Sequence, residues 1–139
     1  MVFVGQDTIL KRLTARRLTL RVERAGQLWL ASDRPGLTGL RDACFFHPEL
    51  LDGAEVALPA VGLAAAYLLV LGKVGRIAAQ VASREAKAAL AEEGIELEAE
   101  RVVKHLPPPH DEAHERLDQR AREAVSPHAF VEDLKRATY

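Results

Sequence analysis

The sequence has few of the side chains that oxidise or deamidate. It contains one cysteine, one methionine and no asparagine, and its arginines (14) far exceed its lysines (5). A single cysteine excludes an intramolecular disulfide, and the first residues lack the basic start and long apolar run of a secretory signal. We therefore expect a protein of the reducing cytoplasm, and the composition is typical of chains that avoid heat-labile side chains.

The chain also lacks an excess of charge of either sign. Its net charge is −1, with 28% charged and 48% apolar residues, as in ordinary globular proteins rather than disordered or membrane proteins. Its 139 residues are a common size for one domain. We predict a single domain over residues 1–139, with a core over about residues 8–104 and a C-terminal helical extension over about residues 111–137.

Charged side chains are absent from one long stretch, the 17 residues from Val56 to Gly72. Such a stretch has to be buried. Pro59 divides it, because proline fixes its own backbone and favours an extended residue before it. We expect a strand over residues 54–58 and a helix over residues 62–71. A membrane-spanning helix needs about 20 apolar residues, so the segment predicts a core helix and no membrane partner.

Periodicity predicts the other elements. A short helix follows a cap at Asp7, and residues 18–23 and 27–30 alternate as a β-hairpin that points Leu18, Leu20 and Val22 inward. Further strands are expected at residues 75–82 and 95–102, the second half-exposed, and further helices at 37–46, 84–93 and in two C-terminal segments. This order predicts an α/β fold, a three-layer α/β/α sandwich with a mixed sheet of about five strands and helices on both faces.

The order of elements is similar to that of the cytidine-deaminase-like fold. Runs of small and apolar residues further resemble a small uncharacterised bacterial family with that fold. These runs are Gly36-Leu-Thr-Gly-Leu40, Asp52-Gly-Ala-Glu-Val-Ala57, Val61-Gly-Leu-Ala-Ala-Ala66, and Ser83 with Ala86, Leu90 and Gly94-Ile95. The likeness covers about residues 10–104 and implies a fold rather than a chemistry, since one fold carries many functions.

The resemblance implies zinc ligands at two helix starts, and this chain lacks them. Deaminases place H-x-E at one helix start and P-C-x-x-C at the next, where these residues hold zinc and activate its water. Here the two helices begin Val61-Gly-Leu-Ala and Ser83-Arg-Glu-Ala-Lys. We therefore expect no cofactor, no stoichiometric zinc and no deaminase activity by the usual mechanism.

The same helix starts offer a place for a small ligand. In open α/β sheets, ligands gather beyond the carboxyl ends of strands, where free backbone N–H groups at helix starts attract anions. The hypothesis takes Ser83, Arg84 and Gly62 as ligand-binding residues, with Arg34 approaching from the turn after the hairpin. The alternative is a structural helix cap at Ser83 with solvated arginines.

A metal site is a competing hypothesis. His110 and His114 are spaced i, i+4, which places two imidazoles one helical turn apart. The zincin pattern has Glu directly after the first histidine, whereas this chain has Asp111, and a third ligand would have to be His105 or His128. The alternative is a solvated helix start that Asp111 caps.

Two further features bear on chemistry and partners. Cys44 has apolar neighbours, which favours an inert buried thiol over a nucleophile. Positive charge is concentrated in the first 24 residues and negative charge in residues 92–100. The near-zero net charge and the single tryptophan disfavour nucleic acid as a partner, and leave a solvated face or an acidic–basic contact between subunits.

The sequence alone thus favours a non-catalytic cytidine-deaminase-like domain that forms a homo-oligomer and binds a small anionic or nucleotide-like ligand. Two alternatives stay open. One is a metal-dependent hydrolase or deaminase with a relocated site, and the other is an oligomeric assembly module without a ligand.

Overall fold

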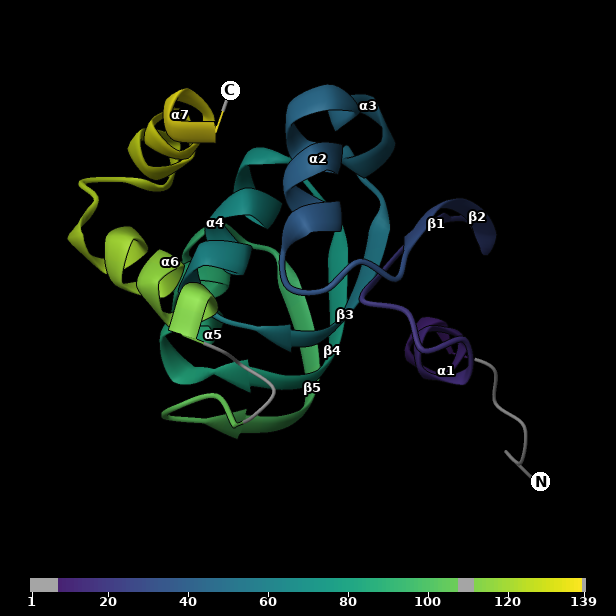
Figure 1. Ribbon diagram of the computed structural model, residues 1–139. Coiled ribbons are helices and arrows are strands. Elements are labelled where there is room, and N and C mark those ends of the chain that lie inside the picture. Colours follow the sequence, from purple (N-terminus) through teal and green to yellow (C-terminus); the bar gives the residue numbers. More distant parts are fainter. Residues whose placement is uncertain (1–7, 108–111, 139) are drawn as a thin grey trace.

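The computed structural model describes residues 8–107 and 112–138. In these ranges the chain forms seven helices and five strands (Figure 1). In chain order they are α1 (Ile9–Ala15), β1 (Leu20–Arg24), β2 (Gln27–Ser32), α2 (Thr38–Phe46), α3 (Pro48–Leu51), β3 (Glu55–Val61), α4 (Leu63–Leu71), β4 (Arg76–Ser83), α5 (Arg84–Glu92), β5 (Glu96–Val103), α6 (Glu112–Glu123) and α7 (Pro127–Thr138).

The strands form one mixed sheet in the order β2-β1-β3-β4-β5. β1 pairs antiparallel with β2 and β3, whereas β3, β4 and β5 are parallel. The register aligns Val61 of β3 with Ala82 of β4, so both strands end at the same edge and the helices after them begin there. The predicted mixed sheet of five strands is confirmed, as is the half-exposed strand β5 at its edge.

The predicted hairpin is confirmed, and its turn explains why it forms. Ala25 and Gly26 both have positive φ angles, 53° and 79°, the backbone that a two-residue hairpin turn requires. Leu20 and Val22 are buried in the main core. Leu18 lies just before β1 and packs against the smaller cluster around α1.

Pro59 acts differently from the sequence-based expectation. β3 was expected to end at Leu58, but it continues through Pro59 to Val61. β1 pairs with β3 only as far as Ala57, so a proline beyond that point removes no hydrogen bond between these two strands. The helix expected at residues 37–46 ends at Phe46, with His47 as its C-cap, and Pro48 then begins the short helix α3, where its missing N–H is not needed.

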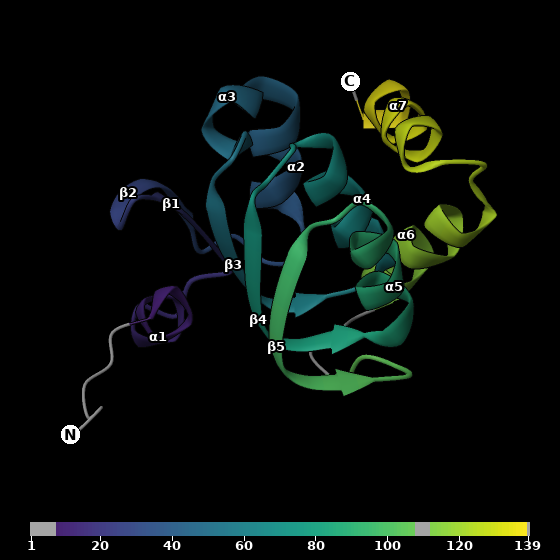
Figure 2. The ribbon, with the colours of Figure 1, turned by 180° about the vertical axis from the view of Figure 1, so that it is seen from behind.

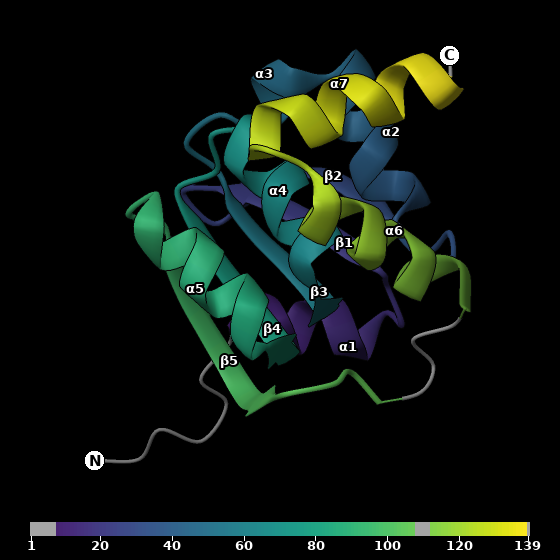
Figure 3. The same ribbon diagram turned by 90° about the vertical axis from the view of Figure 1, so that its left-hand side faces the viewer.

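The helices cover the two faces of the sheet unequally. β3, β4 and β5 follow one another in a single direction, so right-handed crossovers place α4 and α5 on the same face. α2, α6 and α7 also pack against α4 (Figure 3). The opposite face is covered by α1, whose Ile9 and Leu13 contact Ala57 and Ala78 (Figure 2). The expected sandwich is confirmed, but within the described chain its second helix layer consists of α1 alone.

α1 begins at a side-chain cap and is fixed to the sheet by an ion pair. The hydroxyl of Thr8 accepts a hydrogen bond from the Lys11 amide at 3.2 Å, whereas the predicted cap, Asp7, lies outside the described residues. Arg12 donates through Nε and Nη2 to the two oxygens of Glu23 on β1, each at 2.7 Å.

Glu23 is a fully buried carboxylate in the α1 side of the sheet. Besides the two bonds from Arg12, it accepts one from Nε of Arg21. The Arg12 hydrogen bonds are the main cause that lowers the pKa of Glu23, against the opposing effect of burial. Three charge-assisted hydrogen bonds therefore compensate the loss of hydration of this carboxylate.

α4 is the central helix, as its uncharged sequence predicts. Leu63, Ala64, Ala65, Ala66, Leu68 and Leu69 are all buried, and α2, α5, α6 and α7 surround the helix. Tyr67 meets Phe130 of α7 edge to face, with ring centroids 5.8 Å apart. No helix in residues 8–107 and 112–138 has the length and apolar character needed to cross a membrane.

Candidate functional site

A pocket of about 740 Å³ is lined by residues near the carboxyl ends of the three parallel strands. It is open to solvent, and its wall also includes the segment before α2, Pro107 after β5 and His114 of α6. The lining residues are Thr19, Pro35, Gly36, Leu37, Leu58, Pro59, Ala60, Gln80, Val81, Glu100, Arg101, Pro107 and His114. Its position is the one at which open α/β sheets usually bind ligands.

The pocket combines apolar walls with a few polar groups. Leu37, Leu58 and Val81 are buried side chains whose surfaces form part of the wall. Gln80 supplies an amide, and Glu100 and Arg101 supply one charge of each sign. Such a mixture of apolar wall and a few polar groups is typical of sites that bind small organic molecules.

The segment before α2 is held in place from the start of the hairpin. The hydroxyl of Thr19 donates to the carbonyl of Arg34 at 2.6 Å. Gly36 has a φ of 66°, a backbone that favours glycine, and turns the chain into α2. This side of the pocket is therefore formed by a turn that a hydrogen bond connects to the start of the hairpin.

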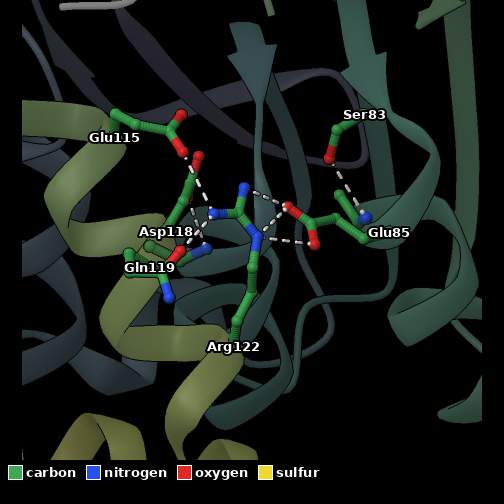
Figure 4. Close-up of polar contacts among 8 residues, drawn as sticks. Ser83, Glu85, Glu115, Asp118, Gln119 and Arg122 are labelled. Carbon is green, nitrogen blue, oxygen red and sulfur yellow. Dashed lines mark hydrogen bonds and ion pairs between the residues drawn. The ribbon is translucent and has the colours of Figure 1, made fainter. Parts of the chain in front are cut away.

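The N-terminus of α4, next to this pocket, is occupied by a side chain of α6. Oδ1 of Asp118 accepts a hydrogen bond from the Ala64 amide at 2.9 Å, and Asp118 is only 3% exposed (Figure 4). A carboxylate at a helix N-terminus is stabilised by the free N–H groups and the helix dipole. Asp118 thus takes the place that a bound anion would have at this helix start.

Gly62 provides the space for this contact. Its φ of −98° is accessible to any residue, so glycine is not needed for backbone conformation. A Cβ at this position would lie 2.5 Å from Oδ2 of Asp118 and 2.9 Å from Oδ1. The missing side chain of Gly62 is therefore what allows Asp118 to reach α4.

A second contact joins α6 to the start of α5. Arg122 donates from Nε and Nη2 to the carboxylate of Glu85, at 2.9 and 2.7 Å, and from Nη1 to Glu115 and Gln119, each at 3.0 Å (Figure 4). The hydrogen bonds to Glu85 are the main cause that raises the pKa of Arg122. α6 therefore closes over the starts of both α4 and α5.

Comparison with known proteins identifies the family. A family profile described as TM1506, a domain of unknown function (DUF1893), matches residues 8–134. The chain belongs to this family. A crystal structure of a DUF1893 family protein (TM1506) from Thermotoga maritima is similar, with a TM-score of 0.78 and 21% sequence identity over 92% of this chain and 86% of that chain. At this identity the likeness shows the fold alone. No curated protein matches the sequence.

In this DUF1893 chain, three of the four predicted ligand-binding residues, Gly62, Ser83 and Arg84, lie at two adjacent strand ends, and Arg34 belongs to the segment between β2 and α2. Gly62 and Ser83 are at adjacent strand ends, and Ser83 is a buried cap whose hydroxyl accepts from the Ala86 amide at 3.2 Å. Arg84 is exposed on α5. Arg34 forms an ion pair with Asp42 of α2 at 2.6 Å. Binding of a ligand by these residues stays a prediction.

The predicted metal ligands are only partly visible. His110 lies outside the described residues, and His114 is half-buried in the pocket wall. Within residues 8–107 and 112–138, no group of three or more His, Cys, Asp or Glu side chains lies close enough together to hold a metal ion. The absence of zinc from the purified DUF1893 protein stays a prediction for measurement.

Cys44 has the environment expected of an inert thiol. Its Sγ donates to the carbonyl of Leu68 at 3.7 Å. Burial raises the pKa of Cys44 to about 11, so the thiol stays protonated at neutral pH and is a poor nucleophile.

Sequence reasoning missed the residues of α6 that close the two helix starts. Asp118 was overlooked because a single acidic residue in a charged helix reads as solvated. One signal was available, since Asp118 lies between Leu117 and Ala121 on the apolar side of that helix. A charged residue on the apolar side of a helix indicates that its side chain is buried and has a polar partner.

Proposed function

We propose that this DUF1893 chain is a non-catalytic binding protein with a cytidine-deaminase-like fold, and that its pocket holds a heterocyclic ligand of the nucleoside class. The observation that carries the proposal is the pocket of about 740 Å³ at the carboxyl ends of β3, β4 and β5. A pocket of this volume lies within the usual range for sites that enclose small organic ligands.

The chemistry of the wall supports a nucleoside-like ligand. An amide such as that of Gln80 offers both donors and an acceptor, which is what the edge of a nucleobase requires. Leu37 and Val81 offer apolar surface to the face of a ring. Glu100 and Arg101 oppose each other in charge, so the pocket gives no strong preference to an anion or a cation.

The neighbouring helix starts support a neutral ligand over a phosphorylated one. Asp118 accepts from the α4 amide, and Glu85 lies in the first turn of α5 and binds Arg122. A phosphate at either place would have to displace a carboxylate that is already bonded. The sequence-based hypothesis of an anionic ligand at Ser83 and Arg84 is therefore tested as the competing form of this proposal.

A non-catalytic role is supported by the residues at the helix starts. Where the deaminase resemblance implies zinc ligands, the chain has Gly62 and Ala64 at one start and Ser83 at the other. Ser83 caps its own helix. Elemental analysis of the purified protein tests this point, and one tightly held zinc per chain would contradict it.

A metal-dependent hydrolase is the second candidate because His114 lies in the pocket wall. It predicts a bound metal that replacement of both His110 and His114 by alanine removes. An unchanged metal content in that double variant would exclude these histidines as ligands.

The main experiment is a thermal-shift screen of nucleobases, nucleosides, nucleotides and simple anions, followed by calorimetric titration. A ligand present at 100 times its dissociation constant adds about 2.7 kcal/mol of stability, which corresponds to a rise of roughly 8 °C for a chain of this size. We expect the largest shifts with nucleosides. No shift with any nucleobase, nucleoside or nucleotide would refute the proposal.

Variants then locate the site. Gln80→Ala and Arg101→Ala should each weaken nucleoside binding about tenfold, since one lost hydrogen bond contributes about 1.4 kcal/mol. Arg84→Ala is the matched control, because Arg84 is exposed on α5 and does not line the pocket. Weakening by Arg84→Ala alone, and stronger binding of nucleotides, would place the ligand at the helix starts instead.

A further inference from the structure

α1 leaves part of its own face of the sheet uncovered. The helix has seven residues and packs mainly on β1, β3 and β4. A groove of about 490 Å³ remains beside it, with Ile9 and Leu10 of α1 on one side, Ala78 of β4 below and Glu98 and Glu100 of β5 on the other side. This groove is separate from the ligand pocket except for Glu100, which lines both.

The two sides of the groove carry opposite charges. On the α1 side, exposed Lys11 lines the groove, and Arg16 and Arg17 are exposed just after the helix, outside the groove itself. β5 presents Glu96 and Glu98 on the same face of the sheet, with side chains that are 68% and 70% exposed. Arg76 lies between the two sides.

Arg76 neutralises only part of the acidic side. Its Nη2 donates to Glu98 at 2.7 Å, its Nε lies 3.4 Å from Glu96, and these contacts raise the pKa of Arg76. Glu100 adds a further carboxylate on β5. The β5 side therefore keeps an excess of negative charge beside the basic helix.

We propose that this face is a homodimer interface in which α1 of a second copy lies in the groove between α1 and β5. A two-fold axis through the face would place the basic helix of each copy over the acidic strand β5 of the other. The second α1 would complete the helix layer that one α1 leaves unfinished, and would bury the half-exposed Leu10 of each copy.

The charge arrangement favours a second copy over other partners. A nucleic acid would meet the carboxylates of β5, and a purely basic or purely acidic protein would be repelled by one half of the face. A surface that carries both signs side by side is complementary to the same surface turned by 180°. The proposal is independent of the ligand pocket, so either can fail without the other.

The experiment measures association by sedimentation velocity and light scattering, at low and high salt. The wild type should be a dimer at low salt, and high salt should raise its dissociation constant at least about tenfold. Two charge-reversed variants should each be monomeric. One reverses β5 (Glu96→Lys with Glu98→Lys), and the other reverses α1 (Lys11→Glu with Arg16→Glu). Their equimolar mixture should form a heterodimer, because the swapped charges are again complementary.

A matched control carries the same change in net charge elsewhere. Glu92→Lys with Glu93→Lys alters the end of α5 on the opposite face and should leave the dimer intact. Circular dichroism confirms that each variant is folded. A monomeric wild type would overturn the proposal, as would reversed variants that associate like the wild type or a mixture that forms no heterodimer. Salt dependence of the wild type tests the same interface without any substitution.

Discussion

The contact between α4 and α6 makes a sharp prediction for Gly62→Ala. The added methyl group would lie 2.5 Å from Oδ2 of Asp118, far inside van der Waals contact, and Asp118 is fixed by its bond to the Ala64 amide. Either the carboxylate moves away from the amide or α6 shifts from α4. Since the φ of Gly62 suits any residue, the whole effect should come from this steric conflict and not from the backbone.

The size of the effect follows from two contributions. Overpacking of a core site costs about 1–3 kcal/mol, and weakening a hydrogen bond to a charged, buried group costs about 1.5–3 kcal/mol. The two costs overlap, because Asp118 can relieve the clash only by giving up part of its hydrogen bond to the Ala64 amide. We therefore expect a loss of about 2–4 kcal/mol in the free energy of unfolding. Asp118→Ala should cost about 1–2 kcal/mol, as for the loss of a helix cap.

The decisive measurement compares the wild type, Gly62→Ala, Asp118→Ala and the double variant. The free energy of unfolding of each protein is measured in urea. Once Asp118 is alanine, the methyl group at position 62 meets no carboxylate, so Gly62→Ala should cost little in that background. The coupling energy should then be about 2–4 kcal/mol, close to the whole cost of Gly62→Ala in the wild type. Additive effects would refute the steric argument. Gln119→Ala, on the same helix but exposed, is the control and should change stability by less than about 1 kcal/mol.

Two further predictions concern buried titratable groups. Glu23→Gln should cost about 2 kcal/mol at neutral pH, because it leaves Arg12 and Arg21 without their carboxylate. The pKa of Glu23 is lowered in the folded protein, so its stabilisation is present at neutral pH and is lost as the pH falls below about 4.5. The difference in the free energy of unfolding between the variant and the wild type, measured by chemical unfolding, should therefore shrink at acidic pH. Native Cys44 should resist iodoacetamide at pH 8 and react quickly in urea, because partial burial raises its pKa to about 11 in the folded protein; fast labelling of the native protein would contradict this raised pKa.

Local patterns in the sequence predict most of the elements. The hairpin is set by alternation around Ala25 and Gly26, and both residues adopt the backbone that the turn needs. The absence of charge between Val56 and Gly72 indicates the central position of α4, because a helix without a polar face can only lie among other elements. These features depend on a few neighbouring residues, so they can be deduced without knowing the tertiary contacts.

The features that sequence reasoning missed depend on contacts between distant residues. Pro59 continues β3 only because β1 stops pairing at Ala57, which is a fact about register. Both crossover helices lie on one face because the strand order continues in a single direction, and order is not encoded in periodicity. Asp118 meets Ala64 across 54 positions of sequence, so neither residue indicates the other.

The position of α6 is an argument for the neutral form of the ligand proposal, which the ligand screen tests. An anion at the α4 start would have to replace Asp118 as the acceptor of the Ala64 amide. This exchange gives no net binding energy, so the anion could bind only through contacts with further residues. Arg122, the nearest candidate, already bonds to Glu85, Glu115 and Gln119, and freeing it would break those contacts. Arg84 is exposed and would contribute as a screened surface charge. The open pocket demands no such exchange, and a neutral ligand therefore has the advantage there.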